Sequence, residues 1–251
     1  MKSFSTAALR YKTSLHMRPC ARAFSLMAFI FTVTVVANVS CGVKQSQSSG
    51  AADNSLKQTL PKEGRLVNDK PVGKDWVNLI ASMNDWNATK DYWKLEDGVL
   101  HGDYNGGEKH NYSYTKTEYK NFELNALVRM SGKDANSGVC IRIKPTDPDN
   151  VPGYQVDMGP GYWGCLWEER KAGMVQKYPA ELAAKLVKEN DWNHYYIIAQ
   201  DHHIRAWLNG VKTIDTVHAG GFSEGSIGFQ LCHGDKRTVL DVKTLSLRKL
   251  N

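Results

Sequence analysis

The chain of 251 residues carries a formal net charge of +6, with 41% hydrophobic and 23% charged residues. These values are typical of a globular chain that can bury a full core. Five of the 32 Lys and Arg residues precede Cys41, where no Asp or Glu occurs, so the rest of the chain is close to neutral. A nearly neutral body lacks the basic surface that phosphate backbones require, so nucleic acid is not expected as a partner.

The first 41 residues have the pattern of an export signal. A basic start precedes an apolar run over residues 24–37, which is too short and wrongly flanked for a stable membrane span. The run Val39-Ser40-Cys41-Gly42 resembles the lipoprotein cleavage motif, although Asn38 stands where Leu is usual. We expect export to the periplasm or cell envelope, with lipidation of Cys41 as the membrane attachment; the alternative is an ordinary signal peptide with an incidental Cys.

After this leader, residues 42–72 are rich in Ser, Gln, Lys and Gly without periodicity and are predicted to be a flexible linker. Residues 73–251 are then expected to form one domain. Its cysteines, Cys140, Cys165 and Cys232, form no Cys-x-x-Cys pair, so no zinc site is predicted and buried thiols are favoured over a disulfide. We expect no cofactor, and the sequence leaves a bound calcium ion open.

The domain consists of short alternating segments separated by turn signals. Asp97-Gly98 and Asn209-Gly210 each predict a β-hairpin, and the only helical periodicity covers Glu181–Glu189. The other predicted strands are Phe122–Met130, Asn193–Gln200, Ile204–Leu208, Val211–Val217, Ser226–Leu231 and Val239–Leu247. Roughly a dozen short strands indicate an all-β, two-sheet jelly-roll sandwich of the concanavalin A-like lectin and glucanase type, with one short helix.

The stretch Gly153–Arg170 combines acids, tryptophans, glycines and an arginine. Its first half alternates as a strand, Gly159-Pro160-Gly161 predicts a turn, and Tyr162–Glu168 alternates again. Carboxylates and a guanidinium cost desolvation energy unless they are paired, and exposed tryptophans leave apolar area in water. The mixture is therefore typical of a cleft that binds a polar ligand with apolar faces, such as a sugar.

Alternation predicts which side chains line this cleft. Arg142 lies between Ile141 and Ile143 and is expected to point away from the core, offering donors to a ligand; a plain surface arginine is the alternative. Gln155 and Asp157 are expected on the same face, where Asp157 either acts on a ligand or caps the following turn.

The end of the stretch leaves two questions open. One of Glu168 and Glu169 is expected to pair with Arg170 while the other is available as a base or as an acceptor for a sugar hydroxyl, and their parity does not decide which faces the cleft. Tyr162 and Trp163 are either sugar-stacking platforms or core residues.

Gln230 and His233 form a further candidate pair near the C-terminus. They combine an amide with an imidazole suited to proton transfer, and a structural histidine is the alternative.

Residues from Trp76 to the C-terminus resemble the 3-keto-disaccharide hydrolase domain family. The resemblance rests on the order and spacing of Asn136-Ser137-Gly138, Arg142, Gly153–Asp157, Tyr162-Trp163-Gly164 with the acidic pair, Trp192-Asn193, Trp207–Gly210 and Gly228–His233. It implies a concanavalin-like jelly roll that acts on glycosides oxidised to a ketone at C3. Many members carry Glu where this chain has Gln155, which puts a catalytic role for that position in doubt.

On this resemblance, the ketone acidifies the C2 proton, so that a base can remove it and the enolate can expel the group at C1. The hypothesis assigns Asp157 or Glu168 as the base, His233 as the proton donor, Arg142, Gln155 and Gln230 as donors to the oxyanion, and Tyr162, Trp163 and Arg170 as further substrate contacts. The expected ligand is an oligosaccharide or glycoside.

Two other functions fit the same fold. A non-catalytic, lectin-like carbohydrate-binding module is the first alternative, because fold does not fix function. A conventional glycoside hydrolase ranks third, because the Glu-x-Asp-x-x-Glu strand of jelly-roll glucanases is absent.

Overall fold

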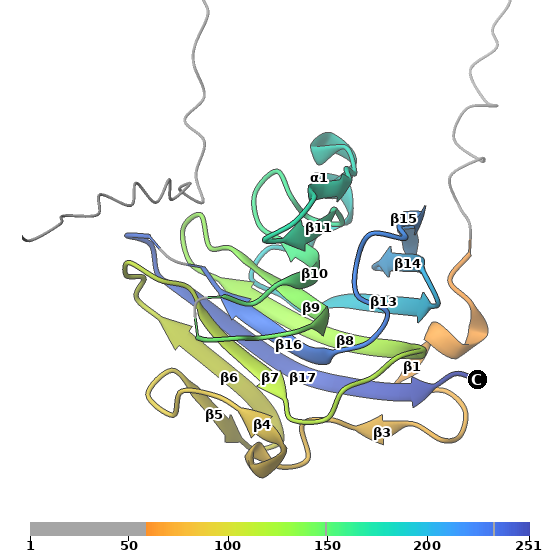
Figure 1. The fold of residues 1–251 in the computed structure, drawn as a ribbon, viewed down its shortest axis with the longest axis horizontal. Helices are drawn as coiled ribbons and strands as arrows, with labels where there is room; N and C mark the ends of the chain where they lie inside the picture. Colours follow the sequence, from red (N-terminus) through yellow and green to blue (C-terminus); the bar gives the residue numbers. More distant parts are fainter. Residues whose placement is uncertain (1–58, 149, 233) are drawn as a thin grey trace, which may run out of the picture.

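The computed structural model describes residues 59–148, 150–232 and 234–251, which form a sandwich of two antiparallel sheets (Figure 1). The first sheet contains, in spatial order, β12 (Gly173–Gln176), β11 (Leu166–Glu169), β10 (Gly153–Met158), β9 (Ser137–Ile143), β16 (Ser226–Leu231), β7 (Asn111–Thr115) and β4 (Trp86–Asn87). The second contains β15 (Val211–Val217), β14 (His203–Leu208), β13 (Asn193–Gln200), β8 (Phe122–Ser131), β17 (Thr238–Lys249), β6 (Val99–Tyr104) and β5 (Trp93–Glu96), with β3 (Val77–Asn78) beside β17. The prediction of an all-β two-sheet sandwich with one short helix is confirmed.

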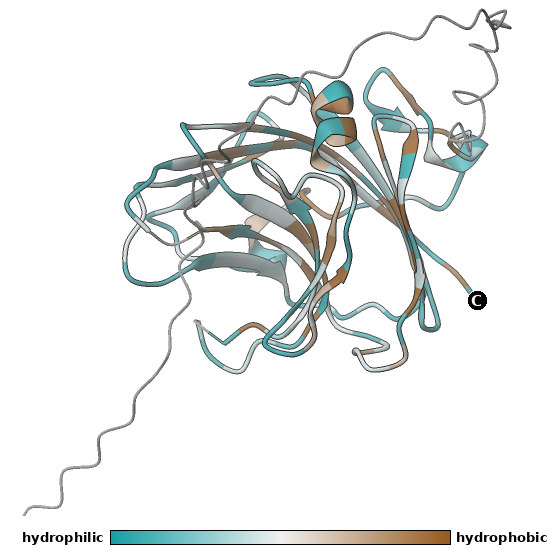
Figure 2. Cartoon of the chain, turned by 90° about the horizontal axis from the view of Figure 1, so that it is seen from above, coloured by the Kyte–Doolittle hydropathy of each residue, from teal (hydrophilic) through white to brown (hydrophobic). Residues whose placement is uncertain are grey.

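The core lies between the two sheets and is built by residues at every second strand position. On β10, Tyr154, Val156 and Met158 face inward and are 1% exposed or less. On β8, Leu124, Ala126 and Val128 do the same from the other sheet. Because the side-chain period of a strand is two, the residues between them are placed on the outer face of each sheet. Figure 2 shows apolar segments along the strands and hydrophilic residues at most of the turns.

Both predicted hairpin turns are confirmed. Asp97-Gly98 joins β5 to β6 and Asn209-Gly210 joins β14 to β15, and all four residues have positive φ between 49° and 87°. A turn with positive φ at both central residues matches the twist of the flanking strands, and Asn, Asp and Gly tolerate that conformation best.

The predicted helix is also present, as α1 (Ala180–Leu186), three residues shorter at its C-terminal end than the periodicity indicates. It lies outside the sandwich near β11 (Figure 1). Asn209 donates a hydrogen bond from its Nδ2 to the carbonyl of Leu186, which links the end of the helix to the β14–β15 turn. Among the described residues, no helix is long and apolar enough to cross a membrane.

The predicted linker of residues 42–72 extends too far toward the C-terminus. Its described part includes the 3₁₀-helix η1 (Lys62–Gly64) and the short hairpin of β1 (Leu66–Val67) and β2 (Lys70–Pro71). Leu60 packs against the buried side chain of Tyr196, and a Cβ on Gly64 would clash with that ring at 2.6 Å. Residues 59–72 therefore cover part of the outer face of the second sheet. The predicted export signal and Cys41, the predicted lipidation site, lie outside the described residues.

Candidate functional site

The outer face of the first sheet carries buried polar side chains on neighbouring strands. Gln155 and Asp157 alternate with the core residues of β10 and are 2% and 6% exposed. In the strand register, Gln155 faces Cys140 of β9 and Asp157 faces Gly138, so all four belong to one face, as the alternation predicts. The next strand, β16, adds Gln230 opposite Gly138.

Hydrogen bonds join these side chains into a chain that crosses four strands. The Gln155 Nε2 donates to Asp157 Oδ1 at 2.6 Å and to Gln230 Oε1 at 3.3 Å. The Gln230 Nε2 in turn donates to the hydroxyl of Tyr112 on β7 at 2.7 Å. The Cys140 thiol donates to Gln155 Oε1 at 3.5 Å. We use the name polar face for the set Tyr112, Cys140, Gln155, Asp157 and Gln230, together with Glu169 of β11.

Gly138 makes this arrangement sterically feasible. A Cβ at this position would lie 2.3 Å from Cγ of Gln155 and 2.7 Å from its Nε2. Because Gly138 has no side chain, the Gln155 amide can lie flat over β9 and reach Gln230 on the strand beyond. Any larger residue would disconnect the two amides.

The structure decides which of the two adjacent acids belongs to the polar face. Trp167 is in register with Gln155 and Glu169 with Gly153, so Glu169 shares the face of Gln155 and Asp157. Glu168 is in register with Tyr154, whose side chain faces the core. Of the two acids whose orientation the sequence left open, Glu169 therefore occupies the face of Asp157, and Glu168, the predicted alternative base, lies on the opposite side of β11.

Glu168 instead lies almost completely buried on the inner side of β11. Its Oε2 accepts a hydrogen bond from the backbone N–H of Ala172 at 3.3 Å and lies 3.9 Å from Nδ1 of His218. Its Oε1 lies 3.9 Å from the ammonium of Lys171. These contacts connect the end of β11 to the β15–β16 loop.

Burial controls the proton affinities on the polar face. Desolvation raises the pKa of Asp157 from 3.8 to about 8, partly opposed by the Gln155 hydrogen bond and assisted by the charge of Glu169. Desolvation also raises the pKa of Glu169, and the guanidinium of Arg170 opposes that shift. The pKa values of the Tyr112 phenol and the Cys140 thiol are raised well above their usual values, first by burial and then by the charge of Glu169.

The charge of Glu169 contributes to three of these raised pKa values. Its charge influences Asp157 on β10, Cys140 on β9 and Tyr112 on β7, although β11 and β7 are separated by three strands in the sheet. Two carboxyls with raised pKa values on one face are characteristic of functional sites.

Arg142 does not point where the alternation predicts. The register between β16 and β9 shifts beside it, and Arg142 has a φ of 51°, which marks a β-bulge. Its buried guanidinium donates to the backbone carbonyls of Lys120, at 2.6 Å from Nη2, and of Asp201. The orientation predicted for Arg142 is therefore wrong: it clamps two turns of the sandwich and is absent from the polar face.

The predicted second strand of the stretch starts later than the alternation indicates. Residues 159–165 form a turn, and β11 begins at Leu166. Trp163 lies in this turn and stacks on Tyr195 in the core, with ring centroids 6.2 Å apart and planes at 8°. The core alternative for Trp163 is thus the observed one. Tyr162 is half-buried in the same turn, and Arg170 is exposed at the end of β11 with a φ of 63°.

Sequence reasoning missed Tyr112 and gave Glu169 no role of its own. Tyr112 lies in a short strand whose pattern differs little from the others, so no local signal marks it. Glu169 could be placed only by knowing where β11 begins. His233, the predicted proton donor, lies outside the described residues. Cys140 and Cys165 are buried free thiols.

The residues that the structure describes contain no group of three or more His, Cys, Asp and Glu side chains able to hold a metal ion.

Solved structures of similar fold support the sandwich architecture. A candidate glycosyl hydrolase from Parabacteroides distasonis ATCC 8503 aligns with a TM-score of 0.52 and 24% identity, over 70% of this chain and 100% of its own. A second one from the same organism aligns with a TM-score of 0.52 and 15% identity, over 70% and 94%. A protein of galectin-like fold from Bacillus subtilis aligns with a TM-score of 0.54 and 10% identity, over 68% and 94%.

A comparison with curated proteins finds no significant match. The model of the 3-keto-alpha-glucoside-1,2-lyase-like domain matches residues 75–248, which include every strand from β3 to β16 and nearly all of β17. The match confirms the resemblance found in the sequence, and the chain belongs to this family.

Proposed function

We propose that the protein cleaves the glycosidic bond of 3-keto-glycosides at the polar face. Its family and its fold support a carbohydrate-active protein. The observation that carries the proposal is the buried carboxyl of Asp157, whose pKa of about 8 lets it exchange a proton near neutral pH on the face that also carries the carboxyl of Glu169.

The chemistry that this substrate requires is an elimination. The C3 ketone acidifies the C2–H bond, and a base removes that proton to leave an enolate. The electron pair then forms the C1–C2 double bond while the C1–O bond breaks, and the departing oxygen takes a proton from an acid. Later addition of water to the double bond would make the overall result a hydrolysis. The enzyme must therefore supply a base, an acid and a donor to the oxyanion.

The two carboxyls of the polar face divide the first two roles by their environments. Asp157 retains its proton at neutral pH because desolvation raises its pKa to about 8, so we assign it as the acid for the departing oxygen. Burial raises the pKa of Glu169 as well, but the charge of Arg170 opposes that shift, and we assign Glu169 as the base at C2.

Tyr112 is our assignment for the oxyanion donor. Its hydroxyl accepts the hydrogen bond from Gln230, so its own proton can be donated to a ligand. Burial keeps the phenol protonated over the whole neutral range. Gln155 and Gln230 then act as positioning residues: they hold Asp157 at one end of the chain and Tyr112 at the other.

The second candidate is a carbohydrate-binding module without catalysis. It is favoured by the hydrogen bond between Gln155 and Gln230, because side chains that hold each other in place form a preorganised surface that suits ligand binding with or without a reaction. For either function we propose that the protein is exported and held at the cell envelope by lipidation of Cys41, which would place it where glycans from outside the cell arrive.

Incubation of the purified protein with a 3-keto disaccharide and with the same sugar unoxidised separates the functions. NMR monitors the amount of each sugar over time. We expect the 3-keto disaccharide to be consumed and the unoxidised sugar to remain. Consumption of the unoxidised sugar would identify a conventional glycoside hydrolase. Binding of either sugar without turnover would identify a binding module, and both of these outcomes contradict the proposal.

A further inference from the structure

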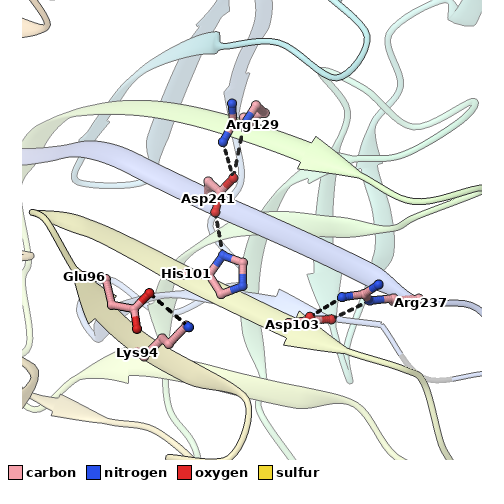
Figure 3. Close-up of polar contacts among 7 residues, drawn as sticks. All are labelled: Lys94, Glu96, His101, Asp103, Arg129, Arg237 and Asp241. Carbon is pink, nitrogen blue, oxygen red and sulfur yellow. Dashed lines mark hydrogen bonds and ion pairs between the residues drawn. The ribbon is translucent and has the colours of Figure 1, made fainter.

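The outer face of the second sheet carries a different set of polar side chains. Lys94 of β5 is in register with His101 of β6, His101 with Asp241 of β17, and Asp241 with Arg129 of β8. These four residues form a transverse line across four strands, which we call the charged row (Figure 3). At a strand spacing of about 4.8 Å, the row spans about 14 Å.

Ion pairs fix the geometry of the row. His101 Nδ1 lies 2.7 Å from Asp241 Oδ1, and the Arg129 Nη2 donates to Asp241 Oδ2 at 2.8 Å. Two residues further along β6, Asp103 accepts two hydrogen bonds from the guanidinium of Arg237 (Figure 3). Because both oxygens of Asp103 and of Asp241 are engaged, neither carboxylate can rotate freely.

A cavity of about 230 Å³ opens at the β5–β6 end of the row. It is lined by Lys90, Asp91, Tyr92, Trp93, Lys94, His101 and Asp103. Three of the lining side chains are each held by a partner that does not line the cavity: Lys94 by Glu96, His101 by Asp241 and Asp103 by Arg237. An ammonium, an imidazole and a carboxylate of the cavity lining are thus each held in place by a contact made outside the cavity.

An aromatic side chain stands at the other end of the row. Trp192 is half-exposed and lies immediately before β13, the neighbour of β8. The guanidinium of Arg129 is 4.8 Å from its ring centroid and the ammonium of Lys243 is 5.5 Å away. These two cations restrain a large ring that is still partly open to solvent.

We infer that the charged row, with its cavity and Trp192, is a second carbohydrate-binding site that takes a neutral oligosaccharide. Sugar hydroxyls both donate and accept hydrogen bonds, and the cavity offers both kinds of partner. The carboxylates of Asp91 and Asp103 disfavour an anionic ligand, while Lys90 and Lys94 disfavour a cationic one. The small cavity suits one sugar ring, and the length of the row suits a chain that continues toward Trp192.

This site lies on the opposite outer face from the polar face, so one molecule cannot use both sites for the same sugar ring. A polymeric glycan bound at the row would instead raise the local concentration of its chain ends near the protein. The inference does not depend on catalysis at the polar face.

Isothermal titration with cellohexaose, maltohexaose and laminarihexaose, and with the anionic trigalacturonate, tests the inference in the Asp157→Asn protein, in which turnover is suppressed. We expect one of the neutral hexasaccharides to bind, and trigalacturonate to bind more weakly. Trp192→Ala and the double variant Lys94→Ala/His101→Ala should each weaken that binding at least ~10-fold, as expected for loss of an anchoring contact.

The matched control is Lys185→Ala, which removes an exposed lysine on α1 away from the row and should leave the affinity unchanged. Thermal melting checks that each variant is folded. If no neutral hexasaccharide binds, if trigalacturonate binds best, or if both row variants bind as tightly as the control, the inference is overturned. Retained binding in the row variants would place the ligand at the polar face.

Discussion

The two outer faces of the sandwich show how burial changes the chemistry of the same residue type. On the polar face, Asp157 is 6% exposed and bonded to a neutral amide, and burial raises its pKa to about 8. On the second sheet, Asp103 is bonded to the guanidinium of Arg237, which lowers its pKa. The first aspartate can therefore transfer a proton near neutral pH, whereas the second remains a fixed negative charge.

The two outer faces also differ in how much of their polar side chains is exposed to water. The side chains of Arg129 and Lys94 in the charged row are 43% and 54% exposed, whereas Gln155 and Gln230 on the polar face are each 2% exposed. Water screens the row and leaves its ion pairs weak, while the polar face depends on hydrogen bonds that water does not replace.

The largest expected effect is on turnover. Asp157→Asn should lower kcat on a 3-keto glycoside by roughly 10²–10⁴-fold, the usual contribution of a general acid or base. Asp103→Asn, the matched change on the other sheet, should alter kcat by less than about two-fold, because it affects only an exposed ion pair. Steady-state kinetics of both variants checks this, and equal losses would remove the distinction between the faces.

The next effect is on stability and depends on pH. Because the folded-state pKa of Asp157 is raised, the unfolded chain releases the proton first as pH rises from about 4, and the folded state is destabilised until about pH 8. Asp157→Asn removes this pH-dependent destabilisation and keeps a side-chain oxygen that can accept the hydrogen bond from Gln155. Relative to the wild type, it should gain ~1–3 kcal/mol in free energy of unfolding at pH 8 and about nothing at pH 4.

Urea denaturation of both proteins at pH 4, 6 and 8 measures this difference. A gain that does not grow with pH would mean that Asp157 is already ionised in the folded protein, and its assignment as the acid would then be withdrawn.

The smallest effect belongs to the charged row. Arg129→Ala should lower the free energy of unfolding by roughly 1 kcal/mol or less at low salt, and by less still in ~1 M NaCl, because salt screens exposed ion pairs. Denaturation of Gln230→Ala under the same two conditions supplies the contrast, since loss of its hydrogen bonds should be insensitive to salt. If the loss in free energy of unfolding depended on salt for Gln230→Ala and not for Arg129→Ala, the comparison between the two faces would be reversed.

Much of the fold could be predicted because local chemistry determines it. Asp97-Gly98 and Asn209-Gly210 favour one turn type, and the alternation of β8 and β10 separates core from surface without reference to distant residues. The same alternation correctly brought Gln155 and Asp157 to one face.

The site was less predictable because it depends on irregularities that leave no periodic signal. A bulge at Arg142 turned its side chain from the outer face toward Lys120 and Asp201. The start of β11 at Leu166 decided between Glu168 and Glu169, and it is set by the turn before that strand. A one-residue change in register moves every side chain to the other face, so parity alone could not choose.

The adjacent acids Glu168 and Glu169 provide the most direct test of the polar face as the catalytic site, because they differ by one position and lie on opposite sides of β11. Turnover of a 3-keto glycoside should be measured for Glu169→Gln and Glu168→Gln, with both variants shown to be folded. We predict that Glu169→Gln loses roughly 10²-fold or more in kcat while Glu168→Gln retains most of its activity. A loss confined to Glu168→Gln, or equal activity in both variants, would contradict the assignment of the polar face as the catalytic site.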